Sequence, residues 1–581
     1  DFATKIRKRE AEMKTLLVAV NSRYDHEGLA VWYLKSACEK KNIPVTVHQY
    51  TINDSPERIW SSILEANADV VAFSCYIWNR RLVLDLVEDL KKARPGTVIM
   101  AGGPETCYEG AENDYYAAGV DIVLKGEGEY RFPMLLETLR DKGLDAARQL
   151  AENQDCCMDV SEYISPFCPE YLERIKGRIS YIESSRGCPY RCSYCLSSES
   201  RKLVFFPHEE IIKDLEALVS AGARVIKFVD RSFNINEEHS LKIWDFIRKF
   251  EGCDVSFHFE INPDRLTEAQ ISSLMAMPPG LVQIEAGIQT VNTGALKAVS
   301  RVMDVDKAIE NLKRLAGNGN IHIHTDLIAG LPYEDIHSFI NSFNRVYEIN
   351  AHHLQLGFLK LLHGTRIRRE AHLHDYKYRS YPPYEVIENR YMKYTDILRL
   401  KKVEEALDRT YNSGRFTLTL EYLLNYFPSP FDLYESFAGY LEKKGMLFMP
   451  IAAARLFKTL REFALNIPGV DSYSLDSYLA LDYASSLKNT VLPDFLSESG
   501  IEVLDARKYL EPFIGGHWKK SYQKRFMLLS GSFPGKMGEN FTEHNNTMLV
   551  DTAFTDPVTG RALIRPFNGT LPDYSNCVKL I

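Results

Sequence analysis

Short apolar runs alternate with longer amphipathic segments from Met13 to about residue 142. The runs are rich in β-branched residues and read KTLLVAV, VTVHQY, ADVVAFSC, TVIMAGG and VDIVLKG. Continuous apolar strands separated by amphipathic helices are typical of a parallel sheet covered by helices on both faces. Residues 13–142 are therefore expected to form an α/β, doubly wound (Rossmann-like) domain.

Four loops of this first domain carry small or polar residues directly after a predicted strand. Ligands of doubly wound sheets bind at the carboxyl ends of the strands. We therefore expect these loops to form one binding rim, made of Asn21, Ser22, Ser74, Gly102, Gly103, Pro104, Gly126, Glu127 and Gly128.

A second alternation occupies residues 179–374. Its predicted strands are RISYIES, RVIKFVD, VSFHFEI, VQIEAGI, HIHTDLI and HLQLGFLKL. Six such units predict a (βα)6 partial barrel of parallel strands, with active groups on the loops that follow the strands. Residues 143–178, where the pattern weakens, are expected to be a linker. Residues 375–581 have Leu, Tyr and Phe at helical spacing and are expected to form a mainly helical third domain.

Length and charge limit the class of protein. A chain of 581 residues is expected to contain several domains, and 45% apolar with 25% charged residues is typical of a globular protein. The net charge of -8 disfavours nucleic acid as a partner. Because no apolar run approaches the roughly 20 residues that span a bilayer, and the run after Met13 is too short for a signal peptide, we expect no membrane association and a cytoplasmic location.

Three cysteines, Cys188, Cys192 and Cys195, lie in the loop SSRGCPYRCSYCLSS after the first barrel strand. Inert buried thiols and a structural zinc site are the alternatives, but zinc usually takes four ligands and no second cysteine pair follows. Three thiolates instead suit three irons of a cubane cluster whose fourth iron stays open. The eleven cysteines are an odd number, which also favours reduced thiols over a disulfide framework.

The CxxxCxxC spacing, with Tyr194 before the last cysteine, resembles that of the radical S-adenosylmethionine (SAM) superfamily. This resemblance implies a 4Fe-4S cluster on Cys188, Cys192 and Cys195 that binds and reductively cleaves SAM. By position in the barrel, it also implies SAM contacts, although each of these residues alone is equally consistent with an ion pair or a helix cap. The implied SAM contacts are Asp230, Glu260, Glu285, Arg301 and Asp326.

The first domain, with GGP and KGEGE after its later strands, resembles the cobalamin-binding domain of the cobalamin-dependent radical SAM branch. The resemblance implies that the nine rim residues bind cobalamin. The DxHxxG signature is absent, so we expect cobalt without a protein histidine beneath it and His26 to be a surface or hydrogen-bonding residue. Cys156, Cys157 and Cys577 are expected to be ordinary thiols.

The resemblance implies a cobalamin-dependent radical SAM methyltransferase that transfers a methyl group from methylcobalamin to an unactivated carbon. The alternative within the same branch is a non-methylating rearrangement or ring closure, and a metal-stabilised binding module is the alternative from another class. Expected partners are a small-molecule or peptide substrate and an electron donor such as flavodoxin or ferredoxin. A tRNA-modifying function is disfavoured by the acidic balance.

Overall fold

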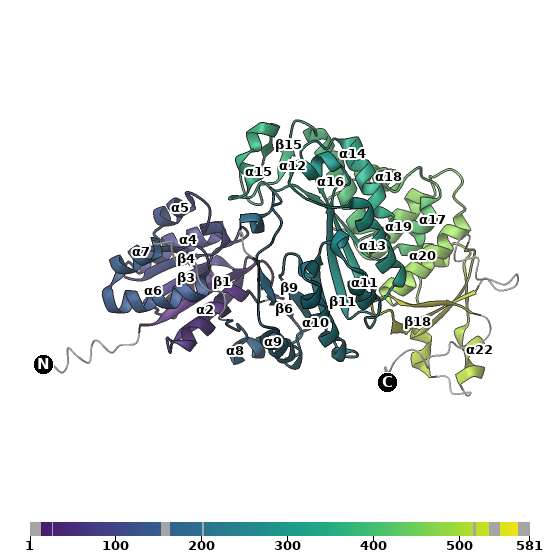
Figure 1. The fold of residues 1–581 in the computed structure, drawn as a ribbon. Helices are drawn as coiled ribbons and strands as arrows, with labels where there is room; N and C mark the ends of the chain where they lie inside the picture. The colour runs from purple at the N-terminus through teal and green to yellow at the C-terminus, as the bar shows by residue number, and fades with distance from the viewer. Residues whose placement is uncertain are drawn as a thin grey trace. The chain divides into compact units, whose positions relative to one another are not determined.

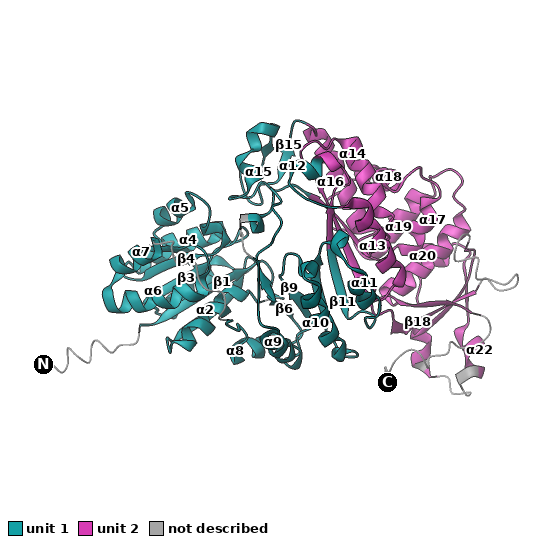
Figure 2. Ribbon diagram, viewed as in Figure 1, with its two compact units in different colours: residues 1–285, 295–303, 358–390 teal, residues 286–294, 304–357, 391–581 magenta. Residues whose placement is uncertain are grey.

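The computed structural model describes residues 13–25, 27–152, 163–199, 203–514, 519–533 and 547–567 (Figure 1). The expectations for His26, Cys156, Cys157 and Cys577 fall outside these described residues. The chain divides into two compact units (Figure 2). Unit 1 comprises residues 1–285, 295–303 and 358–390, and unit 2 comprises residues 286–294, 304–357 and 391–581.

Unit 1 begins with a five-stranded parallel sheet in the order β2-β1-β3-β4-β5. This confirms the doubly wound prediction, and the strand order reverses between β1 and β3, where such sheets bind ligands. The strands are β1 (Thr15–Asn21), β2 (Val45–Thr51), β3 (Val70–Ser74), β4 (Val98–Gly102) and β5 (Ile122–Leu124). The helices are α2 (Leu29–Lys40), α3 (Pro56–Glu65), α4 (Arg80–Ala93), α5 (Ala111–Ala118), α6 (Gly128–Lys142) and α7 (Leu144–Glu152).

Helical periodicity explains how these helices cover the sheet. In α4, Val83, Leu86, Val87 and Leu90 are buried, and their spacing places them on one face of the helix. They pack in one core cluster with residues of β1, β3 and β4. Strand β1 is buried over its whole length, as expected for a central strand of a parallel sheet.

The second set of parallel strands follows the predicted (βα)6 pattern. Within unit 1, β6, β9, β10 and the first half of β11 lie in that order, and within unit 2 the second half of β11 is followed by β12 and β13. The strands are β6 (Ile179–Ile182), β9 (Val225–Phe228), β10 (Ser256–Ile261), β11 (Val282–Gln289), β12 (His322–Ala329) and β13 (His353–Phe358). The helices between them are α9 (His208–Ser220), α10 (Glu237–Ile247), α11 (Glu268–Met275), α12 (Thr293–Ala298), α13 (Val305–Asn318) and α14 (Ile336–Tyr347).

Unit 1 also contains several smaller elements. The short strands β7 and β8 pair antiparallel beside the cysteine loop, and β14 pairs with β15 after the last barrel strand. These elements are α8 (Pro169–Arg174), β7 (Ser185–Arg186), β8 (Val204–Phe205), α15 (Arg366–Arg369), β14 (Lys377–Tyr378) and β15 (Val386–Glu388).

The C-terminal part of unit 2 is mainly helical, as predicted, and ends in a four-stranded antiparallel sheet in the order β16-β17-β18-β19. Its helices are α16 (Tyr394–Arg409), α17 (Thr417–Leu424), α18 (Pro430–Lys443), α19 (Ala453–Ala464), α20 (Ser472–Leu487), α21 (Asp494–Ser497) and α22 (Ala506–Leu510). Its strands are β16 (Glu502–Leu504), β17 (Phe526–Ser530), β18 (Thr547–Thr555) and β19 (Ala562–Pro566). Across the described ranges, no helix combines the length and the apolar character needed to cross a bilayer.

Candidate cofactor sites

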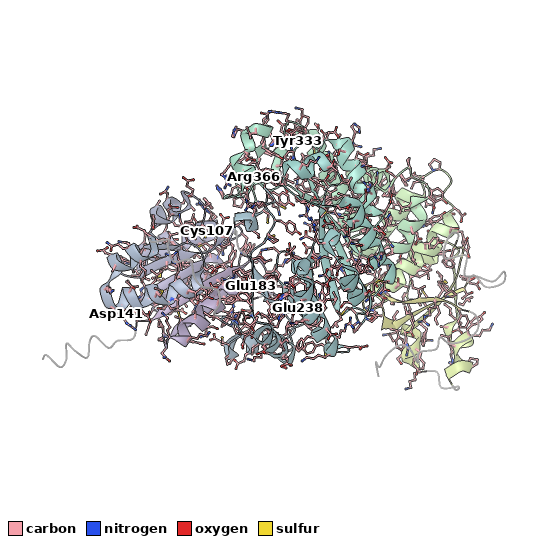
Figure 3. All side chains as sticks on the ribbon, in the orientation of Figure 1. Cys107, Asp141, Glu183, Glu238, Tyr333 and Arg366 are labelled. Atoms are coloured by element: carbon pink, nitrogen blue, oxygen red, sulfur yellow. The ribbon has the colours of Figure 1, made fainter. Side chains whose placement is uncertain are left out.

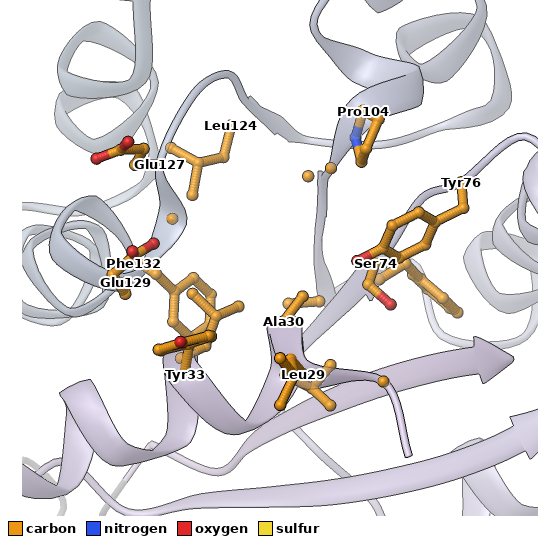
Figure 4. A pocket seen from close by; sticks show the side chains of 18 of the residues that line it. Leu29, Ala30, Tyr33, Ser74, Tyr76, Pro104, Leu124, Glu127, Glu129 and Phe132 are labelled. Carbon is orange, nitrogen blue, oxygen red and sulfur yellow. The ribbon is translucent and has the colours of Figure 1, made fainter. Parts of the chain in front are cut away.

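A cavity of about 610 Å³ lies at the carboxyl ends of the first sheet. This volume is typical of sites that enclose an organic ligand. All nine predicted rim residues line it: Asn21, Ser22, Ser74, Gly102, Gly103, Pro104, Gly126, Glu127 and Gly128. Figure 4 shows the side chains of Ser74, Pro104, Leu124 and Glu127 around the cavity.

Glycine is required where β4 ends. Gly103 has φ +117°, and a Cβ there would lie 2.6 Å from the carbonyl oxygen of Cys75 and 3.0 Å from its nitrogen. The backbone therefore crosses the end of β3 at a distance that no side chain permits. Gly103 thus lets the backbone after β4 pack directly against that of Cys75, at the edge of the cavity that Gly103 lines.

Asn79 fixes the loop after β3. Its buried amide donates to the carbonyl oxygens of Val20 (3.0 Å) and Ser74 (2.9 Å) and accepts the N–H of Tyr76 (2.8 Å). Trp78, whose indole N–H also donates to Val20 (3.0 Å), stacks on Tyr76 with ring centroids 4.5 Å apart. Tyr76 and Trp78 line the cavity and give it an aromatic edge at the point where the strand order reverses.

Helix α2 supplies a wall that sequence reasoning did not assign. Ala30 and Tyr33 face the cavity, together with Phe132 of α6 (Figure 4), and Leu34 also lines it. The spacing of Ala30, Tyr33 and Leu34 in the sequence indicates that they share one face of α2. Such spacing does not tell whether that face packs against the sheet or lines a ligand site.

The cysteine loop turns away from β7 at Gly187, whose φ of 98° favours glycine. Two backbone hydrogen bonds hold the loop: Ser193 donates to the carbonyl of Val299 and accepts from the N–H of Ile367, both at 2.9 Å. Within the loop, the N–H of Cys195 donates to the carbonyl of Cys192 (3.0 Å). The three cysteines are free thiols, with Cys192 buried and the other two half-buried.

Polar side chains surround the thiols. Arg301 Nη1 lies 3.9 Å from Cys192 Sγ and 3.5 Å from the Tyr194 hydroxyl, and Ser232 Oγ lies 3.8 Å from Cys188 Sγ. In the described part of the chain, no group of three or more His, Cys, Asp or Glu is arranged around one metal ion. A cubane cluster takes one thiolate for each of three irons, and the donor set of this loop fits that requirement.

Asp230 supports the start of the cysteine loop. Its carboxylate is 1% exposed and accepts hydrogen bonds from the Ser184 N–H (2.9 Å), the Ser184 hydroxyl (2.7 Å) and the Ser185 hydroxyl (2.5 Å). Burial raises the pKa of Asp230 to about 6, against the lowering effect of these hydrogen bonds. These contacts position the start of the cysteine loop, and the SAM contact expected of Asp230 stays a prediction.

The other predicted SAM contacts are half-buried residues of strands. Glu260 is next to the last residue of β10, whereas Glu285 and Asp326 lie in the middle of β11 and β12. Glu260 pairs with Arg231 (3.3 Å), and Glu285 lies 3.2 Å from His258 Nε2. In unit 2, Asp326 lies 3.1 Å from His324 Nε2. Arg301 is thus the predicted SAM contact that the structure brings directly to the cysteines.

A second, smaller cavity of about 300 Å³ adjoins the first. It shares Glu127, Glu183, Arg186, Val229 and Arg231 with the larger cavity, and its other lining residues are Ser185, Gly187 and Ser197 of the cysteine loop region. Glu183, labelled in Figure 3, lies directly after β6. The two cavities therefore connect the end of the first sheet with the segments that flank the three cysteines, all within unit 1.

Three family models match separate segments of the chain. Residues 15–136 match the B12 binding domain, residues 182–346 match the Radical SAM superfamily, and residues 372–513 match a protein of unknown function (DUF4080).

Two curated relatives have similar sequences. The 2-(S-pantetheinyl)-carbapenam-3-carboxylate methyltransferase of Streptantibioticus cattleyicolor is 26% identical over 49% of this chain and 45% of its own length. The cobalamin-dependent radical SAM methyltransferase TokK of Streptomyces tokunonensis is 26% identical over 54% of this chain and 50% of its own length. The chain thus spans about half the length of these relatives.

One solved structure shares the fold over most of the chain. The cobalamin-dependent S-adenosylmethionine radical enzyme OxsB, with aqua-cobalamin and S-adenosylmethionine bound, superimposes with a TM-score of 0.54 at 12% identity. The match covers 89% of this chain and 83% of OxsB. At this identity, the likeness concerns the fold.

A B12 binding domain followed by a radical SAM domain defines a class of proteins that combine two cofactor sites. Together, these two matches support the resemblance of the chain to the cobalamin-dependent radical SAM family. The radical SAM domain implies a 4Fe-4S cluster and SAM, and the B12 binding domain implies cobalamin. The thiol set of the cysteine loop and the glycine-walled cavity fit these groups.

Proposed function

We propose that the protein is a methyltransferase that transfers a methyl group to an unactivated carbon of a small-molecule or peptide substrate. The observation that carries the proposal is the cavity pair, which runs from the carboxyl ends of the first sheet to the segments flanking the cysteines. Both curated relatives described above are methyltransferases, which supports this choice. When bound, cobalamin would supply the methyl group, and the cluster with SAM would supply the radical that activates the carbon.

In this proposal, the residues of the chain hold and orient the reactants. Cys188, Cys192 and Cys195 hold the cluster, and the Arg301 guanidinium beside Cys192 offsets the negative charge of the thiolates. Arg301 also contacts the Tyr194 hydroxyl, which lies in the same loop. We also keep Asp230, Glu260, Glu285 and Asp326 as proposed SAM contacts.

The substrate is proposed to lie in the smaller cavity. Its lining is polar and charged, with Glu127, Glu183, Arg186 and Arg231. Such groups can orient a polar substrate and displace water from the carbon that reacts. A reduced flavodoxin or ferredoxin is the proposed electron donor.

The test is a product analysis with anaerobically reconstituted protein, reductant and SAM that carries a deuterated methyl group. A fractionated extract serves as the source of substrate. The proposal predicts 5'-deoxyadenosine, S-adenosylhomocysteine and a product whose mass has increased by one labelled methyl group. Formation of deoxyadenosine with a changed product that lacks the label would support a rearrangement or ring closure instead. The absence of deoxyadenosine in every fraction would contradict both reactions.

A further inference from the structure

One guanidinium joins the wall of the larger cavity to the start of the cysteine loop. Arg186 is the last residue of β7 and stands two residues before Cys188. It pairs with Glu129, its Nη2 lies 2.6 Å from Glu183 Oε2, and its Nη1 lies 3.5 Å from Glu127. The two partners Glu127 and Glu129 are 59 and 57 residues away in the sequence, so the pairing is a product of the fold.

The partners of Arg186 belong to different elements. Glu127 and Glu129 lie in the loop before α6 and in its first turn, and both line the larger cavity. Glu183 follows β6 and lines both cavities. Arg186 therefore ties the loop after the first sheet to the strand end that leads into the cysteines.

Aromatic contacts hold the guanidinium in place. Its carbon lies 5.7 Å from the ring centre of Tyr33 and 5.6 Å from that of Phe206. Tyr33 also lines the larger cavity. A planar guanidinium can stack on two rings and pair with several carboxylates at once, whereas a lysine ammonium keeps the charge but loses this geometry.

We propose that Arg186 is a positioning residue for both cofactor sites. Its fork of donors fixes Glu127 and Glu129 at the cobalamin cavity, and its positive charge raises the reduction potential of the cluster held two residues further along the chain. This inference rests on the proposed cofactor chemistry. Its charge and its geometry make separate contributions, which two substitutions can distinguish.

The experiment compares Arg186→Gln and Arg186→Lys with the wild-type protein after anaerobic reconstitution. Cobalamin affinity is measured by absorbance titration, and the potential of the cluster by a redox titration followed by electron paramagnetic resonance. Arg186→Gln is expected to weaken cobalamin binding about tenfold or more. It is also expected to lower the reduction potential, because a positive charge favours the reduced cluster. Arg186→Lys should keep a potential close to that of the wild type while still weakening cobalamin binding.

A matched control is Arg461→Gln in unit 2. Arg461 pairs with both carboxylate oxygens of the buried Asp476, at 2.5 and 2.8 Å, so its loss is chemically similar. We expect the control to leave both cobalamin affinity and cluster potential unchanged. A double substitution of Arg186→Gln with Glu129→Gln should weaken cobalamin binding by less than the product of the two single effects.

Three results would overturn the inference. Wild-type cobalamin affinity and potential in Arg186→Gln would refute it alone and leave the proposed function intact. If Arg186→Lys and Arg186→Gln change cobalamin affinity and the reduction potential of the cluster by equal amounts, the positive charge of Arg186 does not set the potential. A wild-type protein that takes up neither corrin nor cluster would overturn the proposed function as well.

Discussion

At the scale of single residues, the cysteine spacing already indicated an open iron-sulfur cluster. Three thiols within eight positions and no fourth cysteine nearby favour an iron with a free coordination site. The structure adds the neighbours, because Arg301 and Ser232 lie beside Cys192 and Cys188. The pairing of Arg301 with the loop spans 109 residues, and sequence order alone predicted only that it belongs to the SAM site.

Substitution of one cysteine should separate the two cofactor sites. Cys192→Ala removes one of three thiolates, so we expect loss of most of the bound iron and sulfide and no formation of deoxyadenosine. Cobalamin binding should stay within about twofold of the wild type, since Cys192 does not line the larger cavity. Iron analysis and absorbance titration check both expectations.

The control for this substitution is Cys253→Ala, an exposed thiol in a turn that should leave iron content unchanged. Retained cleavage of SAM by Cys192→Ala would contradict the assignment of the cluster.

Asp230 gives a second prediction at this scale. The Asp230 carboxylate accepts three hydrogen bonds through its two oxygens. In Asp230→Asn one of these oxygens becomes an NH2 group, which cannot accept, so at least one donor loses its partner. We expect a loss of about 1–3 kcal/mol in the free energy of unfolding. Because Ser184 and Ser185 start the cysteine loop, the cluster should also be lost faster on dilution. Denaturant titration and the decay of cluster absorbance measure the two effects, and an unchanged decay would argue against a positioning role.

At the scale of elements, the apolar runs of the sequence predicted where the strands lie, but they did not predict where several of the strands end. The run RISYIES predicts a strand to residue 184, yet β6 ends at Ile182. The reason is that the N–H of Ser184 donates to Asp230 instead of to a neighbouring strand. The run VDIVLKG likewise predicts more than β5, which ends at Leu124, because Gly126 belongs to the cavity loop. Side-chain partners distant in sequence decide such ends, and a local pattern does not contain them.

The end of β4 offers a test of the cavity wall. Gly103→Ala places a Cβ against the backbone of Cys75 at a positive φ, so we expect a loss of stability of about 1–3 kcal/mol and weaker cobalamin binding. Gly96→Ala is the control, since a Cβ at Gly96 has no neighbour within 4 Å. Thermal unfolding and absorbance titration measure the effects. Equal behaviour of the two variants would contradict a wall that depends on bare backbone.

A buried carboxyl in unit 2 predicts a pH dependence. Glu334 is 0% exposed and accepts hydrogen bonds from Thr290 and from Ser342 (3.1 Å). Burial raises the pKa of Glu334 from its usual value near 4.5 to about 7. The folded state therefore binds the proton more tightly than the unfolded state, and this stabilisation is full below about pH 4.5 and is lost as the pH rises through about 7.

The corresponding variant is Glu334→Gln, which keeps an amide oxygen as acceptor and does not titrate. The wild-type protein should lose up to about 3 kcal/mol of stability from this group as the pH rises from acid to mildly alkaline values. The variant should lack that part of the decline, which melting temperatures across the range measure. Parallel curves for the two proteins would show that the pKa of Glu334 does not differ between the folded and unfolded states.

At the scale of the whole molecule, unit 1 contains both the cavity proposed for cobalamin and the cysteine loop. The order of domains and their fold classes could be predicted from the sequence, because each has its own strand and helix period. The contribution of α2, Glu183 and Arg186 to the cavity lining could not be predicted from the sequence. An amphipathic pattern indicates that a face is buried, but it does not indicate whether that face packs against protein or against a ligand. The match of residues 372–513 to a family of unknown function leaves the choice of substrate to experiment.

The most direct test of the account is the cofactor content of the anaerobically reconstituted chain. We predict about four irons, about four sulfides and one corrin per chain, with no zinc. The corrin should remain bound when the three cysteines are replaced by alanine, and the iron should be absent from that variant. Zinc in place of iron, or a chain that binds no corrin, would contradict the assignment of two cofactor sites to unit 1.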